Sequence, residues 1–409
     1  MREQLAIDGG VPVRDVAHRP WPRWPIYDET EAQALLQVLH SGKWWYVEGE
    51  QGKTFEQEFA RFHDAQHGVA CTNGSAALEI ALRALGIGCG DEVIVPPYTF
   101  VATASSVLAV GATPVFVDIE EDTLNIDPDL IEAAITPRTR AVIPVHIAGR
   151  PANIDAVLEV ARRHGLHVIE DAAQAHAAEW RGRKVGALGD MGTFSFQASK
   201  NLNAGEGGMV ITNNEQMADA AWSVMNVGRV RSGKWYEHHV LGSNFRLTEF
   251  QAAILRAQLK RLPEQTARRE ASARHLRQML AEIHGICLPS EDPRITRHAY
   301  HLFTFRYTPE AFGGRPLSDF LRALNAEGVP CSSGYVPLYR EAVFVRYARR
   351  TGTWCQAGRP QDYPNLHLPV CEQVCSDTVW LQQYLLLGDT ADMEDIATAI
   401  ARIQGAWGR

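Results

Sequence analysis

Short apolar runs alternate with amphipathic segments between residues 70 and 215. Several runs consist almost entirely of Val and Ile, which is typical of strands covered on both faces of a parallel sheet. Segments between them, such as NIDAVLEVARRHG at 153–165, repeat apolar residues with the spacing of a helix. The pattern therefore predicts an α/β unit with a mostly parallel sheet. The predicted strands have the sequences EVIVP, TPVFVDI, RAVIPVHI, HVIEDAA, GTFSFQ and GGMVITN.

The pattern changes after residue 245. Residues 248–283 form one long helical stretch, which Pro263 is expected to bend or break. Beyond it the chain predicts a strand, a helix and a second strand over 298–333, and a closing helix over 390–403. We therefore predict two domains: a large α/β domain over residues 1–260 and a smaller C-terminal α+β domain over 261–409.

Composition excludes several classes of function. The chain has 409 residues, of which 45% are hydrophobic and 22% charged, as in ordinary globular proteins. Its net charge of -8 offers no basic surface for nucleic acid or for an anionic membrane. No apolar run approaches the roughly 20 residues of a membrane helix, and MREQLAIDGG lacks the apolar core of a signal peptide. We expect a cytoplasmic protein whose partners are small molecules and a second copy of itself.

Cysteine usage argues against a metal site. The seven cysteines have no framework spacing, which favours reduced thiols. Cys371 and Cys375, with His367 nearby, are the alternative metal site, but no second close pair completes four ligands. No bound metal is therefore predicted.

The segment TNGSAALEIALRALG is a candidate anion site. Gly74 and Ser75 precede a pattern with apolar residues on one helical face. A turn that opens a helix presents free backbone N–H groups at the positive end of the helix dipole, where a phosphate can bind. Ordinary helix capping is the alternative.

Asp171, Phe100 and Lys200 are three further candidate site residues. Asp171 ends an apolar strand next to Glu170, and strand alternation sends the two carboxylates to opposite faces, so that one needs a buried partner; the alternative is a helix cap. Phe100 follows a strand end, where it could stack on a flat ligand or pack in the core.

Lys200 follows the strand FSFQ and precedes the turn AGEGG. A lysine at a strand end is often only a solvated terminus, but in a dry site its amine loses basicity and becomes a nucleophile. An anion cradle, a carboxylate, an aromatic plate and a nucleophilic lysine are together what pyridoxal phosphate requires.

The sequence resembles the DegT/DnrJ/StrS family of aminotransferases that depend on pyridoxal phosphate and act on sugars or cyclitols. The resemblance covers nearly the whole chain. It rests on the segments LAIDGGVPVR, TNGSAAL, EVIVPPYTFVATA, VIEDAAQAH, FSFQASKNLNAGEGG and GSNFRLTEFQAA. It implies the fold-type I architecture, with a sheet of the seven-stranded type in the large domain.

The resemblance also implies a role for individual residues. Lys200 would be the Schiff-base lysine and proton shuttle, and Asp171 the partner of the ring nitrogen. Gln174 would lie near the 3-hydroxyl of the ring, and Phe100 would stack on the ring. The phosphate would be bound by Gly74, Ser75, Ser195 and, from the second subunit of a homodimer with shared sites, Asn244. One departure is Ala177 after His176, where the family often has glycine; another is Ser75 where many members have threonine.

The implied reaction moves an amino group from L-glutamine or L-glutamate to a keto-cyclitol or keto-sugar in two half-reactions. The segments VWLQQYLLLG and GYVPLY are similar to the branch that holds cyclitol and aminohydroxybenzoate enzymes. An enzyme like aminohydroxybenzoate synthase is therefore an alternative. A second alternative is a dehydratase or lyase of the same family, but in those relatives the lysine is replaced, often by histidine. A binding module that regulates transcription is the third, but residues 1–30 are too short and too rich in Pro and Trp for a DNA-binding segment.

The residues that would contact the ketone stay open. Arg246 is expected either to receive the carboxylate of the donor or to pair with Glu249. An aromatic packing cluster is the alternative for the tryptophans among the remaining candidates. Those candidates are Trp44, Trp45, Tyr46, His301, Tyr335 and Tyr339.

Overall fold

A seven-stranded sheet forms the centre of the large α/β unit. The computed structural model describes residues 4–348 and 361–408. The strand order is β1-β9-β8-β5-β4-β2-β3; β9 runs antiparallel to both of its neighbours, and the other pairs are parallel. The six predicted strands and the mostly parallel sheet are confirmed. The strands are β1 (His67–Cys71), β2 (Glu92–Val95), β3 (Thr113–Phe116), β4 (Thr139–Val142), β5 (His167–Asp171), β8 (Met191–Ser195) and β9 (Gly208–Thr212).

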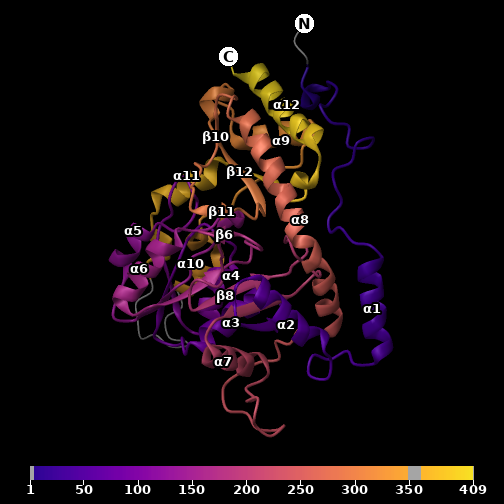
Figure 1. Ribbon diagram of the computed structural model, residues 1–409. Coiled ribbons are helices and arrows are strands. Elements are labelled where there is room, and N and C mark those ends of the chain that lie inside the picture. Colours follow the sequence, from indigo (N-terminus) through magenta and orange to yellow (C-terminus); the bar gives the residue numbers. More distant parts are fainter. Residues whose placement is uncertain (1–3, 349–360, 409) are drawn as a thin grey trace.

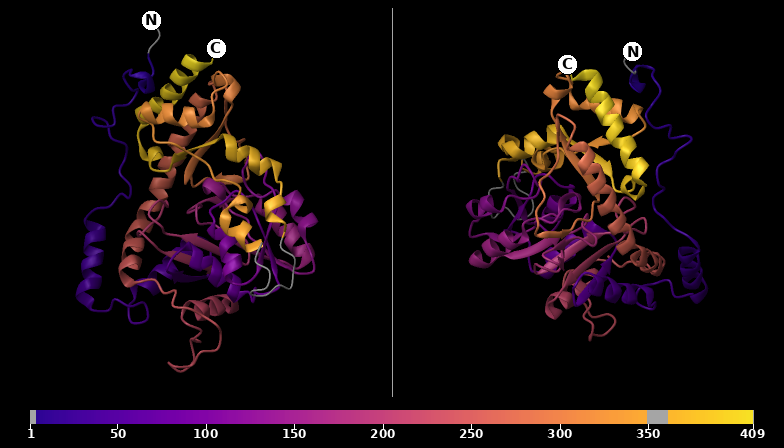
Figure 2. Two further views of the ribbon diagram at one scale, coloured as in Figure 1. Left: turned by 180° about the vertical axis from the view of Figure 1, so that it is seen from behind. Right: turned by 45° about the horizontal axis from the view of Figure 1, so that its top comes forward.

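Helices cover both faces of this sheet (Figures 1 and 2). Val168 and Ile169 are successive residues of β5, and they belong to two different hydrophobic clusters, one on each face. Helices α2 and α6 and the first half of α8 pack in the first cluster, and α3, α4 and α7 pack in the second. The α-helices of the described residues are α1 (Glu29–Ser41), α2 (Gln51–Phe62), α3 (Gly74–Ala84), α4 (Ala102–Ala109), α5 (Pro128–Ile131), α6 (Ile154–His164), α7 (Glu215–Met225), α8 (Glu249–Leu280), α9 (Leu317–Ala326), α10 (Ala342–Ala348), α11 (Pro369–Asp377) and α12 (Thr390–Trp407).

Helix α8 runs from the large sheet to the C-terminal elements (Figure 1). It begins with a capping box formed by Thr248 and Gln251, and it continues without interruption through Pro263. The expected break is therefore not present. A proline costs the helix one hydrogen bond to the carbonyl four residues earlier, but Leu262 and Leu259 are buried, and tertiary packing holds the helix together. The domain boundary predicted at residue 260 stays a prediction and falls inside this helix.

A second, antiparallel sheet lies at the C-terminal end of α8. Its strand order is β10-β12-β14-β13. A separate hydrophobic cluster joins this sheet to α9, α12 and the last turns of α8. The predicted order of strand, helix, strand and closing helix is confirmed, although β13 has only two residues. The strands of this sheet are β10 (Ile286–Cys287), β12 (Leu302–Tyr307), β13 (Ser332–Ser333) and β14 (Thr378–Gln382). A third, three-stranded sheet consists of β6 (Glu179–Trp180), β7 (Arg183–Lys184) and β11 (Ile295–Arg297).

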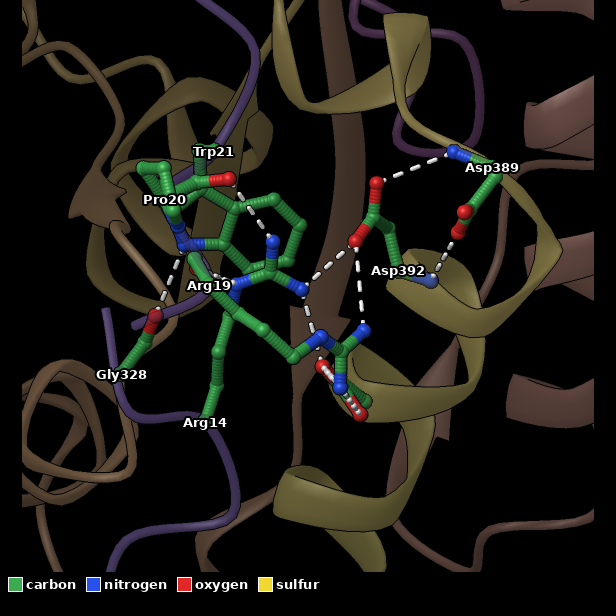
Figure 3. A network of polar contacts seen from close by, with 8 residues as sticks. Arg14, Arg19, Pro20, Trp21, Gly328, Asp389 and Asp392 are labelled. Atoms are coloured by element: carbon green, nitrogen blue, oxygen red, sulfur yellow. Dashed lines mark hydrogen bonds and ion pairs between the residues drawn. The ribbon is translucent and has the colours of Figure 1, made fainter. Parts of the chain in front are cut away.

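The N-terminal strap, residues 4–28, runs along the outside of the molecule (Figures 1 and 2). Arg14 anchors it: the guanidinium donates to Asp392 at 2.6 Å and to Asp395 at 2.9 Å on α12, and it lies 3.7 Å from the ring centre of Trp21 (Figure 3). The far end of the strap reaches the loop after β8, where the indole N–H of Trp24 donates to the carbonyl of Ala198 at 3.0 Å. The strap therefore connects the C-terminal helix with the loop that carries Lys200.

The described residues include no helix that is both long and apolar enough to cross a membrane. Nor do they contain a group of three or more His, Cys, Asp or Glu side chains that could hold a metal ion. Cys371 and Cys375 are free and contact each other at 3.8 Å. The expectation of reduced thiols is wrong at Cys89, which is disulfide-bonded; it lies exposed between α3 and β2, where a thiol can pair without disturbing the core.

Candidate functional site

A cavity of about 660 Å³ lies at the carboxyl ends of β5 and β8. Ligands of open α/β sheets bind at this edge, because the loops and helix N-termini that follow the strands meet there. The predicted site residues line this cavity, with the exception of Asn244: the lining includes Gly74, Ser75, Phe100, Asp171, Gln174, Ser195 and Lys200. Residues far apart in the sequence are thus brought to one place.

An anion cradle forms one end of the cavity. Asn73 caps α3 by accepting from the N–H of Ala76 at 2.8 Å, so that Gly74 and Ser75 occupy the first turn. Within the described part of the chain, the N–H groups of Gly74 and Ser75 donate to no residue. They therefore remain free for an anion at the positive end of the helix.

Ser195 closes the cradle from the end of β8. A Cβ placed on Gly74 would lie 2.7 Å from the Cβ of Ser195, closer than side-chain atoms approach one another. Glycine is thus required at position 74 for close contact between the helix and the strand. The reading of TNGS as capping alone is incomplete, because Asn73 provides the cap and leaves the next two N–H groups unused.

Asp171 lies buried at the end of β5, on the opposite face from Glu170. Glu170 accepts from the N–H groups of Gly186, Leu188 and Gly189 at 2.7 Å each and contacts His146 at 2.9 Å. This confirms that strand alternation separates the two carboxylates.

The Asp171 carboxylate accepts from the hydroxyl of Thr103 at 2.8 Å and from the N–H of Ala173 at 3.2 Å. The Thr103 hydroxyl in turn contacts the hydroxyl of Thr99 at 3.0 Å. Burial raises the pKa of Asp171. The carboxylate therefore lacks a full counter-charge, and a cation in the cavity would supply it.

Lys200 faces the same cavity from the loop after β8. Burial lowers the pKa of Lys200 to about 8, although the charge of Asp171 opposes this shift. A sizeable fraction of the amine is therefore neutral near physiological pH. A neutral amine can act as a nucleophile or as a base, whereas a solvated strand-end lysine stays protonated.

Phe100 and Gln174 complete the predicted set within one chain. The ring of Phe100 is 55% exposed although it borders the cavity, so the alternative of core packing does not hold. An exposed ring at a cavity wall can stack on a flat ligand. Gln174 accepts from the N–H of Ala148 at 2.8 Å and donates to the hydroxyl of Tyr335 at 3.0 Å, which fixes the orientation of its amide.

Asn244 does not line the cavity of its own chain. It lies exposed in the loop between α7 and α8, which projects from the body (Figure 1), and forms an isolated bridge with Asn226. Nearby Arg246 donates to Asn226 at 2.9 Å and not to Glu249, whose carboxylate instead accepts from backbone N–H groups of α2.

The far wall of the cavity comes from the C-terminal elements. His301 and Tyr335, two of the open candidates, lie there, together with Trp380 and Gln382 of β14. Thr103, Trp380 and Gln382 were not predicted. Thr103 sits in a run of small residues with no distinguishing pattern, and Trp380 and Gln382 occupy an ordinary alternating strand, so only the tertiary fold reveals them.

The other open candidates lie elsewhere. Tyr46 is buried with its hydroxyl bonded to Glu56, and Tyr339 is buried with its hydroxyl bonded to Glu372. The indole ring of Trp45 packs against Trp235. These residues do not contribute to the cavity of their own chain.

Ala177 keeps the backbone that glycine would adopt. Its φ is +67°, in the left-handed region, and its side chain is fully buried. The departure from glycine therefore leaves the chain path in a glycine-like conformation and introduces strain of about 1 kcal/mol.

The residues present fit pyridoxal phosphate. The free N–H groups of α3 suit a phosphate, the under-compensated carboxylate of Asp171 suits a protonated ring nitrogen, and the exposed ring of Phe100 suits the face of a pyridine. Lys200 lies in the same cavity, where its amine can reach an aldehyde.

Comparison with known proteins agrees with this arrangement. The model of the DegT/DnrJ/EryC1/StrS aminotransferase family matches residues 25–401. The L-glutamine:2-deoxy-scyllo-inosose aminotransferase of Streptoalloteichus tenebrarius is 41% identical, over 98% of this chain and 98% of that protein. The 3-amino-5-hydroxybenzoate synthase of Amycolatopsis mediterranei is 37% identical, over 93% of this chain and 98% of that protein.

A solved structure shows the same fold. The crystal structure of 3-amino-5-hydroxybenzoic acid synthase superposes with a TM-score of 0.87 at 35% identity, covering 97% of this chain and 100% of that one. The match extends through both the large sheet and the C-terminal elements. The chain therefore belongs to the DegT/DnrJ/EryC1/StrS aminotransferase family and is a pyridoxal phosphate-dependent aminotransferase of the fold-type I architecture.

Proposed function

We propose that this enzyme moves the amino group of L-glutamine, or of L-glutamate, to a ketone on a polyhydroxylated ring, a keto-cyclitol or keto-sugar. The observation that carries the proposal is full-length similarity, at 41% and 40% identity, to two proteins named L-glutamine:2-deoxy-scyllo-inosose aminotransferase. The far wall supports it, because His301, Tyr335 and Gln382 offer several polar groups to a ring that carries hydroxyls.

Each site residue has a distinct task in this proposal. Bound pyridoxal phosphate supplies an aldehyde that accepts amino groups and a ring that takes up the electron pair of the broken C–H bond. Lys200 would hold the aldehyde between turnovers, and its neutral Nζ would move a proton between the donor's α carbon and the C4′ carbon of the cofactor. Asp171 holds the ring nitrogen protonated.

The remaining residues position the cofactor. The N–H groups of Gly74 and Ser75 and the hydroxyl of Ser195 would hold the phosphate. Phe100 would stack on the ring, and Gln174, fixed by Ala148 and Tyr335, would lie near the 3-hydroxyl. Because these contacts hold the ring on several sides, Lys200 acts at a defined position.

The proposal includes a homodimer with shared sites. The loop between α7 and α8 carries Tyr236 and Leu241, which are 86% and 80% exposed, and Trp235 and Val240 are about half exposed beside them. An apolar cluster of this kind on a projecting loop is typical of an interface. Asn244 lies at the base of the same loop, so the contact with a second copy would carry it toward the neighbouring cavity.

The charges of the cavity also support a shared site. Among the described residues that line it, Lys200 is the only lysine or arginine. The carboxylate of an amino-acid donor needs a cation, and an arginine of the second subunit would supply it.

A cytoplasmic location is part of the proposal. Five of the cysteines that the structure describes are free thiols, as is usual in a reducing compartment, and Cys89 is the exception.

The decisive experiment follows the absorption of the bound cofactor. We expect purified enzyme with pyridoxal phosphate to show a visible band that fades on addition of L-glutamine or L-glutamate. The band should return on addition of a keto-cyclitol or keto-sugar. Lys200→Ala is the matched control: it should abolish turnover and still bind some cofactor through the cradle. Full turnover in that variant would refute the role of Lys200.

The second candidate function is that of an enzyme like 3-amino-5-hydroxybenzoate synthase, because a protein of that name matches this chain in sequence and another in structure. The same assay separates the two. A panel of neutral polyhydroxy ketones restores the band in the first case. In the second, the band returns only with an acceptor that carries a carboxylate.

A further inference from the structure

A second pocket, separate from the cofactor cavity, lies between α8 and the linker that joins β10 to β11. It has a volume of about 430 Å³, and we call it the hinge pocket. Glu270, Arg274 and Arg277 of α8 recur at the spacing of one helical face and form one side. Arg150 enters from the turn after β4. The hinge pocket is lined by Arg150, Glu270, Arg274, Arg277, Ser290, Glu291, Asp292, Pro293, Ile295, Thr296, Arg297, His298 and Tyr300.

Arg150 is the unusual residue of this pocket. It is only 8% exposed, and its Nε is buried without a hydrogen-bond partner. Its guanidinium makes no hydrogen bond or ion pair with any residue that the structure describes. Burial lowers the pKa of Arg150, which the more distant charges of Asp122 and Asp292 oppose. A guanidinium stays charged in proteins, so this site holds a buried cation without a counter-ion.

The acidic residues of the pocket already have partners other than Arg150 and Arg274. Asp292 forms a two-pronged pair with Arg294, with contacts from 2.8 to 3.1 Å. Glu270 accepts from the N–H of His298 at 3.1 Å and lies 3.6 Å from Arg297.

Glu291 is 84% exposed and approaches Arg277 at 3.6 Å. Arg274 has no ion pair or hydrogen bond within the described residues. The pocket therefore has an excess of unpaired positive charge at Arg150 and Arg274.

We propose that the hinge pocket binds an oxyanion of the phosphate class, either inorganic phosphate or the phosphate group of a small metabolite. Arg150 forms the floor of the site and makes charge-assisted hydrogen bonds to the anion, and Arg274 and Arg277 flank it. The ligand is distinct from the phosphate of the cofactor, which has its own cradle at α3.

The hinge pocket and the cofactor cavity share two chain segments. Ala148 bonds to Gln174 in the cavity, and Arg150, two residues later, lines the hinge pocket. His301 lines the cavity and its neighbour Tyr300 lines the hinge pocket, with a left-handed φ of +47° and its ring stacked on His298. Binding of an anion at Arg150 therefore acts on a backbone that also positions Gln174.

The test uses the enzyme loaded with pyridoxal phosphate, so that the cofactor cradle is filled. Binding of inorganic phosphate is measured by equilibrium dialysis, with the ionic strength held constant by sodium chloride. We expect one exchangeable phosphate per chain in the natural enzyme. Arg150→Gln, which keeps most of the side-chain volume, should weaken this binding by about tenfold or more, because charge-assisted bonds are lost.

Two further variants make the result specific. Arg322→Gln removes the same charge from the exposed face of α9 and should leave phosphate binding unchanged. Arg274→Gln changes an exposed residue, so it serves if Arg150→Gln fails to fold, and it should weaken binding several-fold. No exchangeable phosphate in the natural enzyme, or equal binding in the natural enzyme and the hinge-pocket variants, would overturn the proposal.

Discussion

At the scale of single residues, two threonine hydroxyls lie in series beside the buried carboxylate of Asp171. Thr99 contacts Thr103, and Thr103 donates to the carboxylate. Burial alone pushes the pKa of Asp171 upward, and the hydrogen bond from Thr103 is the main opposing contribution. Thr103 is therefore a positioning residue for the carboxylate.

Thr103→Val should weaken the enzyme in a defined way. Valine keeps the shape of threonine but leaves the Asp171 carboxylate without its hydroxyl donor, a loss of about 1.5–3 kcal/mol for a bond to a charged group. We expect weaker binding of pyridoxal phosphate and a kcat/KM at least roughly tenfold lower. Thr103→Ser keeps the hydroxyl and should restore most of both quantities. Equal behaviour of the two variants would show that only volume matters.

Because Lys200 is buried, the free energy of unfolding of the cofactor-free protein should depend on pH. Its pKa is about 8 in the folded state against an ordinary value of 10.5, so between these values the unfolded chain binds more protons and stability rises with pH. Below pH 8 the folded protein carries a buried charge that costs about 3 kcal/mol.

Lys200→Met should therefore raise the free energy of unfolding at pH 7, and this gain should shrink as the pH rises above about 8 and vanish near 10.5. Urea unfolding at several pH values measures it. A gain that does not change with pH would mean that the amine is not the cause.

The sequence predicts the cofactor residues better than the residues that support them. Lys200, Asp171 and Gly74 occupy strand ends or helix starts, and the periodicity places these at one edge of the sheet. Thr103 lies on a different helix and is identified only by its distance to Asp171. Ala177 looks like an ordinary small residue, and only its left-handed backbone shows that it occupies a position suited to glycine.

At the scale of elements, Arg14 provides the most buried ion pairs of the N-terminal strap. The side chain of Arg14 is 2% exposed and shares Asp392 and Asp395 with Arg19, whose side chain is 50% exposed. The same acidic pair thus meets a buried cation and a solvated one, which makes the two arginines a matched comparison (Figure 3).

Arg14→Leu should lower the free energy of unfolding by about 3 kcal/mol, because it leaves two partly buried carboxylates without their main partner. Arg19→Leu should cost less than about 1 kcal/mol, because a solvated pair contributes little. Chemical denaturation of both variants measures the difference. Similar losses in the two would show that the strap is not anchored mainly at Arg14.

Elements with strong periodicity were predictable, and those defined by partners were not. The six Val- and Ile-rich strands follow from the sequence, but β1 (His67–Cys71) begins with His-Gly and has a single valine, so its strand character depends on pairing with β9. Local rules allow Pro263 to bend or break a helix, and the break does not occur because neighbours pack on both halves of α8. Local propensity yields to tertiary packing in both cases.

At the scale of the whole molecule, the proposed sharing of sites between two copies can be tested by mixing defects. Lys200→Ala and Asn244→Ala should each be nearly inactive alone. If Asn244 acts across the interface, a mixed dimer has one site with both defects and one site with neither. Co-expression should therefore restore about a quarter of the natural activity, because half of the dimers are mixed and each has one intact site. No recovery would place Asn244 in the site of its own chain, and full activity of Asn244→Ala alone would place it outside catalysis.

The interface itself has an independent readout. Leu241→Asp puts a charge on the exposed loop at a residue that does not line the cavity of its own chain. We expect it to shift the protein from dimer to monomer in sedimentation experiments and to lower activity at low protein concentration, where the weakened dimer dissociates. An unchanged dimer would exclude this loop as the main contact.

The two walls of the cofactor cavity come from separate parts of the chain. The wall that would hold the cofactor is built from residues 73–206, and the facing wall from residues 301–382. Substitutions in the C-terminal third can therefore alter which ketone is accepted while the residues that would bind the cofactor stay unchanged. New acceptors can therefore be reached by few mutations, and laboratory evolution for a new amino sugar should confine its first library to positions such as Trp380 and Gln382.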